Sequence, residues 1–430
     1  MLSLLLAGCL TQPADPFKEP DVPVVSDDSG TPDTTPDTTP DTTPDTEPPP
    51  PEIGEESIGD QVLEDDWIFA LDFIHDIEIT LPEESVTALD VDPYTYTEGS
   101  VSFNGEELEN VGVRLRGKIG SFRELSGKPK FKIDFNQFIE DQRFYGLETI
   151  SLNNSVVDCS YLKEHVGYAL FGAVGVPASR TGIARVWVNG APYGLYTLIE
   201  VPDDRFLIRH YDEPDGNLYD GKYVWYGGYS YTLLDFAEGN DTLFQLEEGT
   251  DVGHVDISGV SNSLSAAAGT PGWYETMGQV IDWPLLHREW AVEQWVGQND
   301  GYGLNTNNYR VYFDPADGLA DIIPWDLDYS FLYDSEWGLS WSSPSGKLLY
   351  YCINDATCAA AQQAVVAEVL QAADDRDLVG LFDDMALLID SDARSDPRRE
   401  CSESSIDYEQ AEVRAWMVNK NASMRSFWGL

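Results

Sequence analysis

The sequence predicts an α+β fold with a strand-rich N-terminal part and a helix-rich C-terminal part. Segments of alternating apolar and polar residues, such as IHDIEITLP (74–82), predominate in the first half of the chain. Longer segments of helical periodicity follow Cys358. A chain of 430 residues with 42% hydrophobic residues and 12 Trp can bury a substantial core. Strands followed by helices in this way are typical of α+β proteins.

The strand-rich part should contain two β-hairpins and a separate strand. We expect one hairpin to turn at Asn104-Gly105 and the other at Asn189-Gly190, because Asn-Gly favours tight two-residue turns. KPKFKIDF (128–135) predicts the separate strand. Alternation would place three lysines on one face of that strand, namely Lys128, Lys130 and Lys132.

Apolar periodicity predicts helices over residues 161–175 and 285–298. NNYRVYFDPADGLADIIPWDLDY (307–329) predicts a third hairpin, whose second strand would carry Asp326 and Asp328 on one face. Residues 212–270 are rich in Gly, Ser, Asp and Tyr, so we expect loops and short strands there. Further helices are expected over residues 359–373, 377–389 and 407–427.

The composition divides the chain into a signal segment (1–8), a tether (9–66) and one folded domain (67–430). Residues 10–66 contain 17 acids, a single base and the repeat PDTTPDTTPDTTPDTE. Such a segment cannot bury apolar surface and stays extended. We interpret it as a tether between a membrane and the folded domain. A role of its Thr residues in adhesion or glycosylation is the alternative.

Leu6-Ala7-Gly8-Cys9 resembles the lipoprotein box of bacterial precursors, in which a signal peptidase cuts before the cysteine and the cysteine is lipidated. The resemblance implies an exported protein that a lipid on Cys9 holds at the membrane; plain secretion is the alternative. No later run approaches the roughly 20 apolar residues that span a bilayer, so the lipid would be the sole anchor.

Four further cysteines could form two disulfides in an exported protein. They are Cys159, Cys352, Cys358 and Cys401. Cys352 and Cys358 are close enough in the sequence to close a small loop. Free buried thiols are the alternative.

The net charge of −51 argues against nucleic acid as a partner, because a phosphate backbone would be repelled. Divalent cations are the more suitable companions of a chain with 76 acids and 25 bases. A strongly solvated surface accounts for most of these acids.

The chemistry is concentrated in NDGYGLNTNNY (299–309) and in PWDLD, about twenty residues later. Asp300 follows a predicted helix, and Asn305 follows Asp300 by five positions. An Asn and one or two carboxylates, here Asp326 and Asp328, supply the oxygen ligands that Mg²⁺ requires. A further Asp can accept a proton from a hydroxyl nucleophile, so this set indicates phosphoryl transfer. A helix cap at Asp300 and an Arg partner for Asp326 are the structural alternatives.

Basic groups that could contact phosphates lie upstream. The strand with Lys130 and Lys132 supplies cations in a chain with nine Lys, and Glu164 lies on the following helix. RLRGKIGSFR (114–123) is a basic, Gly-containing segment that could cover phosphates through backbone N–H groups and Arg116 or Arg123. A solvated strand face and a surface helix position are the alternatives for the lysines and for Glu164.

Taken together, these segments resemble the CotH family, named for a bacterial spore-coat protein. The resemblance covers roughly residues 70–420 and is carried, in the order of the family, by GVRLRG, FKIDF, LKEHVGYALFGAVGVPASR, VWVNGAPYGLYTLIEVPD, GNLY, NTNNYRVYFDP and IIPWDLDYSF. It implies an atypical protein-kinase-like fold and transfer of phosphate from ATP to Ser residues of proteins.

The resemblance also implies residue roles. Asp300 matches the catalytic Asp, and Asn305 and Asp326 match the metal ligands, with Asp328 as a second carboxylate. Lys132 is the best match for the phosphate-contacting Lys, with Lys130 as the fallback. The remaining matches are Glu164 as the partner of that Lys and Glu200 where a kinase hinge would pass the adenine. Arg116 is predicted as a cofactor contact from the basic segment alone, not from the resemblance. The implied cofactors are ATP and Mg²⁺ or Mn²⁺.

These observations predict an exported kinase that phosphorylates Ser or Thr hydroxyls of a protein acceptor. Because ATP is scarce outside the cytoplasm, the alternative is a non-catalytic surface protein, structural or adhesive, on a kinase-like scaffold. A metal-dependent hydrolase would use the same acids and would release phosphate without an acceptor.

Overall fold

The computed structural model describes residues 64–227 and 230–430. The predicted signal segment, the lipidation of Cys9 and nearly all of the tether fall on residues outside these ranges. The folded domain includes Asp65, whose buried carboxylate pairs with Arg180 and Arg205 at 2.8 and 3.0 Å. Asp66 begins the short 3-10 helix Asp66–Phe69. Order therefore extends at least two residues before Trp67.

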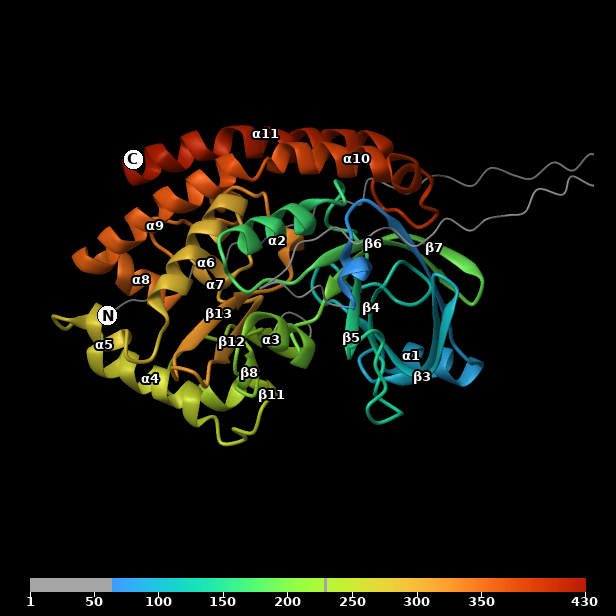
Figure 1. The fold of residues 1–430 in the computed structure, drawn as a ribbon, viewed down its shortest axis with the longest axis horizontal. Coiled ribbons are helices and arrows are strands. Elements are labelled where there is room, and N and C mark those ends of the chain that lie inside the picture. Colours follow the sequence, from blue (N-terminus) through green and yellow to red (C-terminus); the bar gives the residue numbers. More distant parts are fainter. Residues whose placement is uncertain (1–63, 228–229) are drawn as a thin grey trace, which may run out of the picture. The chain divides into compact units, whose positions relative to one another are not determined.

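The first half of the domain is a closed seven-stranded barrel (Figure 1). Its strands are β1 Ile74–Thr80, β2 Thr97–Phe103, β3 Glu106–Arg116, β4 Lys130–Asp134, β5 Thr149–Asn153, β6 Thr181–Val188 and β7 Ala191–Glu200. Their order is β1-β2-β3-β4-β5-β7-β6, and the parallel pairing of β1 with β6 closes the barrel. The barrel core contains the alternating apolar residues that predicted these strands, including Ile77, Val113 and Ile133.

Both predicted Asn-Gly turns are confirmed. Asn104 and Gly105 have φ angles of 50° and 88°, and Asn189 and Gly190 have φ angles of 51° and 76°. Positive φ at both central residues is what a tight hairpin turn requires, and Asn and Gly adopt it at least cost.

Helix α2 (Lys163–Ala173) lies between the barrel and the helical part of the domain. It packs on strand β6 of the barrel. It also packs on three helices, α6 (Trp283–Val296), α9 (Ala356–Asp375) and α10 (Leu378–Ser395). Because it has neighbours on several sides, even Lys163, Glu164 and His165 are buried. The helix predicted over residues 161–175 therefore forms, without an exposed polar face in its first turn.

A four-stranded sheet, in the order β11-β8-β12-β13, forms the centre of the second half. Its strands are β8 Asn217–Asp220, β11 Gln245–Glu248, β12 Tyr309–Phe313 and β13 Ala320–Pro324, and a separate pair comprises β9 Val224–Gly227 and β10 Ser230–Thr232. Shorter helices of the domain are α1 Glu83–Val91, α3 Asp204–His210, α4 Val255–Ala267, α5 Trp273–Met277, α7 Tyr302–Asn305 and α8 Lys347–Asn354. The expectation of loops and short strands over residues 212–270 missed α4, whose buried residues Ile257, Val260 and Leu264 recur at helical spacing.

The predicted C-terminal helices are confirmed as α9 Ala356–Asp375, α10 Leu378–Ser395 and α11 Glu403–Trp428. Figure 1 shows α10 and α11 running side by side. The segment between them reaches the barrel, where the buried Asp396 carboxylate accepts from Lys128 Nζ at 2.6 Å and from Leu195 N at 3.1 Å. In the described ranges, no helix has the length and apolar character needed to cross a membrane.

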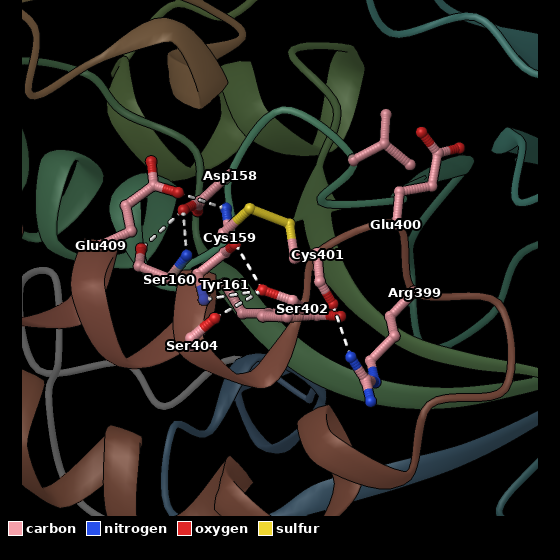
Figure 2. Close-up of a disulfide and its surroundings, with 12 residues drawn as sticks. Asp158, Cys159, Ser160, Tyr161, Arg399, Glu400, Cys401, Ser402, Ser404 and Glu409 are labelled. Carbon is pink, nitrogen blue, oxygen red and sulfur yellow. Dashed lines mark hydrogen bonds between the residues drawn. A yellow bond between two sulfur atoms is a disulfide. The ribbon is translucent and has the colours of Figure 1, made fainter. Parts of the chain in front are cut away.

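Two disulfides are present, as the even count of cysteines allowed: Cys159–Cys401 and Cys352–Cys358. Figure 2 shows that the first joins the segment before α2 to the segment before α11. Beside it, Glu409 accepts from Cys159 N at 2.7 Å and pairs with Lys163. The α10–α11 pair is thus tied covalently and by charge to the start of α2.

The prediction of one strand through residues 322–329 is wrong. β13 ends at Pro324, Asp326 has a left-handed conformation with φ 48°, and residues 327–329 form a 3-10 helix. The two acids still converge, because the chain turns at Asp326 and not because they alternate along a strand.

Candidate active site

Four carboxyl groups and two cations meet between the barrel and the helical part. We call this group the acid cluster; it comprises Arg116, Lys130, Glu164, Asp300, Asp326 and Asp328. The two cations come from strands β3 and β4, and Glu164 comes from α2. Asp300 lies between α6 and α7, and the two remaining acids follow β13. Elements separated by up to 212 positions, from Arg116 to Asp328, therefore contribute to one site.

Lys130 joins the two halves of the cluster. Its Nζ lies 3.1 Å from Asp326 Oδ1 and 2.6 Å from Asp328 Oδ2, and its side chain is 1% exposed. Arg116 Nη2 lies 2.9 Å from Asp326 Oδ2. Burial alone would raise the pKa of Asp326, but Lys130 and Arg116 outweigh it and lower that pKa. Burial and the charge of Asp326 raise the pKa of Asp328.

Asp300 is held by side-chain amides. Asn305 Nδ2 donates to Asp300 Oδ1 at 2.6 Å, and the Nδ2 groups of Asn307 and Asn308 donate to Oδ2 at 3.1 and 3.0 Å. Burial raises the pKa of Asp300 to about 7, against the effect of these amides and together with the charges of Asp328 and Asp326. The amides therefore fix the position of this carboxylate, and the charges of Asp326 and Asp328 raise its pKa.

Glu164 is part of the cluster but has a partner other than the expected lysine. Asn153 Nδ2 donates to both of its oxygens, at 2.8 and 2.7 Å. Burial and the charges of Asp326 and Asp328 raise the pKa of Glu164 to about 8, although the charge of Lys130 opposes this. Among the described residues, the carboxylates that lie within 4 Å of Lys130 Nζ are those of Asp326 and Asp328.

The two candidate lysines have different surroundings in the structure. Lys132 is two residues farther along β4, where Glu247, Arg114 and Asp203 act on its charge, and burial lowers its pKa. Lys130, the fallback, is the lysine that contacts the acids. Residues two positions apart along a strand lie on the same face, so the sequence could not separate the two lysines.

Glu200 does not offer its side chain to a nucleotide. It is fully buried, and its carboxylate pairs with Arg180 at 2.8 Å and with Arg209 at 2.5 Å. Burial would raise its pKa, but the two guanidinium groups lower it well below the usual range. We call this second group the arginine cluster; it comprises Asp65, Asp66, Arg180, Glu200, Arg205 and Arg209.

The basic segment 114–123 lies next to the acid cluster. Lys118 Nζ is 5.4 Å from the ring centroids of both Tyr223 and Trp225. Arg123 pairs with Glu400 and donates to Gly120 O at 3.0 Å. Arg116 also donates to Ser151 and, at 3.2 Å, to Asn153 Oδ1, so this predicted cofactor contact is already part of the charge network.

Several supporting residues were not singled out from the sequence. Asn153 links Arg116 to Glu164, and Gln298 Nε2 donates to Asp326 O at 2.9 Å. Asn308 Nδ2 donates to Asp300 Oδ2 at 3.0 Å. The detectable signal was a run of amides at the ends of apolar strands, as in LNN before α2 and NTNNY before β12.

The acid cluster has an excess of negative charge that a bound cation would offset. Four carboxyl groups against two cations give an excess of two negative charges when all are ionised, and the raised pKa values of Asp300 and Glu164 result from this excess and from burial. The donor set of Asn305, Asp326 and Asp328 has the oxygen chemistry that Mg²⁺ or Mn²⁺ prefers. Elsewhere in the described chain, the ligand atoms of His287, Cys352 and Cys358 lie within 4.8 Å of one another. The two cysteines form a disulfide, however, so their sulfur atoms are not thiolate ligands.

A family model for CotH kinase protein matches residues 113–368, which include every member of the acid cluster. This chain belongs to that family. The inner spore coat protein H of Bacillus subtilis (strain 168) is 24% identical over 206 residues, which are 47% of this chain and 53% of that protein. The chain thus spans about half the length of the curated relative it matches.

Solved structures with a similar course of the chain have low similarity scores. A chain of the Shewanella oneidensis MR-1 toxin–antitoxin complex of HipA, HipB and operator DNA has a TM-score of 0.34 and 11% identity, over 81% of this chain and 71% of that one. The Helicobacter pylori proinflammatory kinase CtkA has a TM-score of 0.28 and 9% identity, over 76% of this chain and 88% of its own. The family assignment therefore rests on the sequence match, and it makes this a kinase-like protein whose family implies the use of ATP.

Proposed function

We propose that this protein is an exported kinase that transfers the γ-phosphate of ATP to Ser or Thr hydroxyls of a protein acceptor, with Mg²⁺ or Mn²⁺. One observation carries the proposal: Lys130 of the barrel contacts Asp326 and Asp328 of the helical part, beside an Asp300 that three amides hold in place. These are the charges and the proton acceptor that phosphoryl transfer requires.

The residues of the acid cluster then have separate roles. Asp300 orients the acceptor hydroxyl and accepts its proton, and the Asn amides prevent its carboxylate from turning away. Lys130 and Arg116 offset negative charge on the phosphates. Asn305 and Asp326, with Asp328, would hold the divalent cation, which when bound neutralises charge that develops on the transferred phosphoryl group.

Export and anchoring remain part of the proposal. The two disulfides support an oxidising compartment, because cytosolic proteins rarely keep such bonds. The lipoprotein-like Leu6-Ala7-Gly8-Cys9 supports a lipid anchor on Cys9. Growth of the native strain with a labelled fatty acid should label the wild-type protein and leave a Cys9→Ala variant unlabelled.

The kinase activity can be tested on the full chain with γ-labelled ATP, Mg²⁺ or Mn²⁺ and a Ser-rich acceptor protein. We expect label on the acceptor, and a loss of about 10²-fold or more for Asp300→Asn, because the acceptor hydroxyl loses its base. Asp384→Asn, at an exposed position on α10, is the matched control and should keep full activity. Phosphate release without acceptor labelling would indicate a hydrolase, and the absence of both transfer and nucleotide binding would indicate a non-catalytic scaffold.

A further inference from the structure

Two glutamates of α6 lie next to the segment that contains Asp300 and helix α7, and among the described residues no cation acts on their charge. Glu289 and Glu293 are one turn apart on α6 and are 0% and 1% exposed. No N–H or hydroxyl group of the described residues donates to the Glu289 oxygens. Likewise, no described cation acts on the pKa of either carboxyl group. A buried acid pair without a cation is costly, so it calls for an explanation.

Glu293 binds the backbone of helix α7. Its Oε1 accepts from Tyr302 N at 2.8 Å, and its Oε2 accepts from Gly303 N at 2.9 Å. These N–H groups open the helix and have no partner within it. The residue before α7 is Gly301, which has no side chain to cap them. Glu293 therefore performs from another helix the task that an N-cap side chain usually performs.

The two glycines of the DGYG segment make this contact possible. A Cβ atom on Gly301 would lie 2.0 Å from Glu293 Oε1, and one on Gly303 would lie 2.8 Å from Glu293 Oε2. Any other residue at either position would push the carboxylate away from the backbone. The two glycines thus leave the space that the Glu293 carboxylate occupies.

A short path leads from Glu293 to the reacting groups. Helix α7 has four residues, and its last residue, Asn305, donates to Asp300 at 2.6 Å. Asn305 N in turn donates to Gly301 O at 3.0 Å. The position of α7 therefore sets both the proposed base and a proposed metal ligand, and Glu293 sets the position of α7.

Glu289 accounts for the charge of the pair. Two carboxylates in contact and away from water cannot both ionise readily. Burial raises the pKa of Glu293 to about 7, and burial and the charge of Glu293 raise the pKa of Glu289 well above its usual range. The two backbone N–H groups that Glu293 accepts from favour the anion on Glu293, and the shared proton is then favoured on Glu289.

We propose that Glu293 is a positioning residue of the phosphoryl-transfer site, which fixes α7 through the Tyr302 and Gly303 amides, and that Glu289 is the neutral acid that shares its proton with Glu293. This inference rests on the proposed function. It adds two residues that contact neither nucleotide nor acceptor and that act on the reaction through α7 alone.

The test compares two isosteric variants of the full chain, Glu293→Gln and Glu289→Gln. Gln at 293 offers one acceptor to two N–H groups, so kcat should fall by about 10- to 100-fold while the KM for ATP changes less than about threefold. Gln at 289 still donates a hydrogen bond, so kcat should stay within about twofold of the wild type. In Gly303→Ala the added Cβ would meet Glu293 Oε2 at 2.8 Å and the Trp341 ring at 2.9 Å, so this variant should also lower kcat.

Amide hydrogen exchange of residues 299–308, measured on the same proteins, separates this inference from the proposed function. Faster exchange in Glu293→Gln, with wild-type exchange in Glu289→Gln, supports the positioning role even if the wild type transfers no phosphate. Equal effects of both Gln variants, or unchanged kcat and unchanged exchange in Glu293→Gln, would overturn the proposal.

Discussion

The arginine cluster and the acid cluster are both buried groups of opposite charges, yet their balance differs. In the arginine cluster, three carboxylates face three guanidinium groups, at distances of 2.5 to 3.0 Å. In the acid cluster, four carboxyl groups face one ammonium and one guanidinium group. The pKa of Glu200 is accordingly lowered in the first, and the pKa of Glu164 is raised to about 8 in the second.

From this difference we expect a structural role for the arginine cluster and a ligand site in the acid cluster. A cluster of balanced charge has no excess charge for a further ion to offset, and removal of one partner leaves an uncompensated charge. A cluster with excess negative charge stores unfavourable energy that a cationic ligand can relieve. Glu200 and Asp326 each pair with two cations, so only the charge balance of the whole cluster distinguishes them. The nucleotide site at Glu200 and the metal site at Asp326 stay predictions.

The largest expected effect comes from making the same substitution in both clusters. Glu200→Gln removes the carboxylate that pairs with Arg209 and one of the three that pair with Arg180, so it should cost about 3–5 kcal/mol of the free energy of unfolding. Glu164→Gln replaces a carboxyl group that is largely protonated at pH 7, so it should cost about 1 kcal/mol or less. Denaturant midpoints of the two variants, measured without nucleotide, test this, and equal losses would contradict the distinction between the clusters.

The pH dependence of the two variants should have opposite signs. The pKa of Glu200 is lowered by folding, so its contribution to stability is present above about pH 4.3 and is lost as the pH falls further. The gap between wild type and Glu200→Gln should therefore close below pH 4. The pKa of Glu164 is raised to about 8, so its contribution is present below about pH 4.3 and is lost as the pH rises towards 8.

For Glu164→Gln, the wild type should thus lose stability relative to the variant between pH 5 and pH 8. Melting temperatures recorded at intervals across both ranges give the two slopes. Parallel curves for wild type and variant in either range would mean that the corresponding pKa shift is absent.

Variants of the two clusters should differ in how much Mg²⁺ and nucleotide stabilise the protein. Mg²⁺ with a non-hydrolysable ATP analogue, at about 100 times its Kd, should stabilise the wild type by about 2.7 kcal/mol. Glu200→Gln should keep this increment, although its starting stability is lower, whereas Asp326→Asn should lose most of it. Chelation with EDTA should reverse the gain, and an equal response of Asp326→Asn would remove the cation from the acid cluster.

Local signals in the sequence were sufficient for most of the fold. The Asn-Gly turns, the alternating strands and the helical periods of α2, α6 and α9–α11 each depend on neighbouring residues, so they could be recognised without knowing the tertiary structure. The helix α4 was missed because its small and polar residues, as in SNSLSAA, resemble a loop in composition. The turn at Asp326 was missed because its positive φ depends on Gln298 and Asn308, which hold its carbonyl group.

The composition of the acid cluster was predictable, but its pairing was not. Asp300, Asn305 and Asp326 follow from the spacing of polar residues and from the family resemblance. Which cation each acid contacts depends on residues far away in the sequence, such as Asn153 for Glu164 and Arg180 for Glu200. Glu289 and Glu293 could have been noticed as two acids one turn apart on a helix that is otherwise mostly apolar or aromatic.

The smallest effect is expected at Lys132, and it tests the choice between the two lysines. Lys132 lies about 7 Å from Lys130 along the strand, and its charged neighbours include Glu247 and Asp203, not the acids of the cluster. Lys132→Met should therefore change the KM for ATP by less than about threefold, which corresponds to roughly 0.6 kcal/mol. Lys130→Met should abolish the stabilisation by Mg²⁺ and the ATP analogue, because Asp326 and Asp328 lose the ammonium group that holds them together. The opposite result is that Lys132→Met abolishes nucleotide binding and Lys130→Met does not. Lys130 would then have a structural role, and Lys132 would be the phosphate contact, as the family resemblance implies.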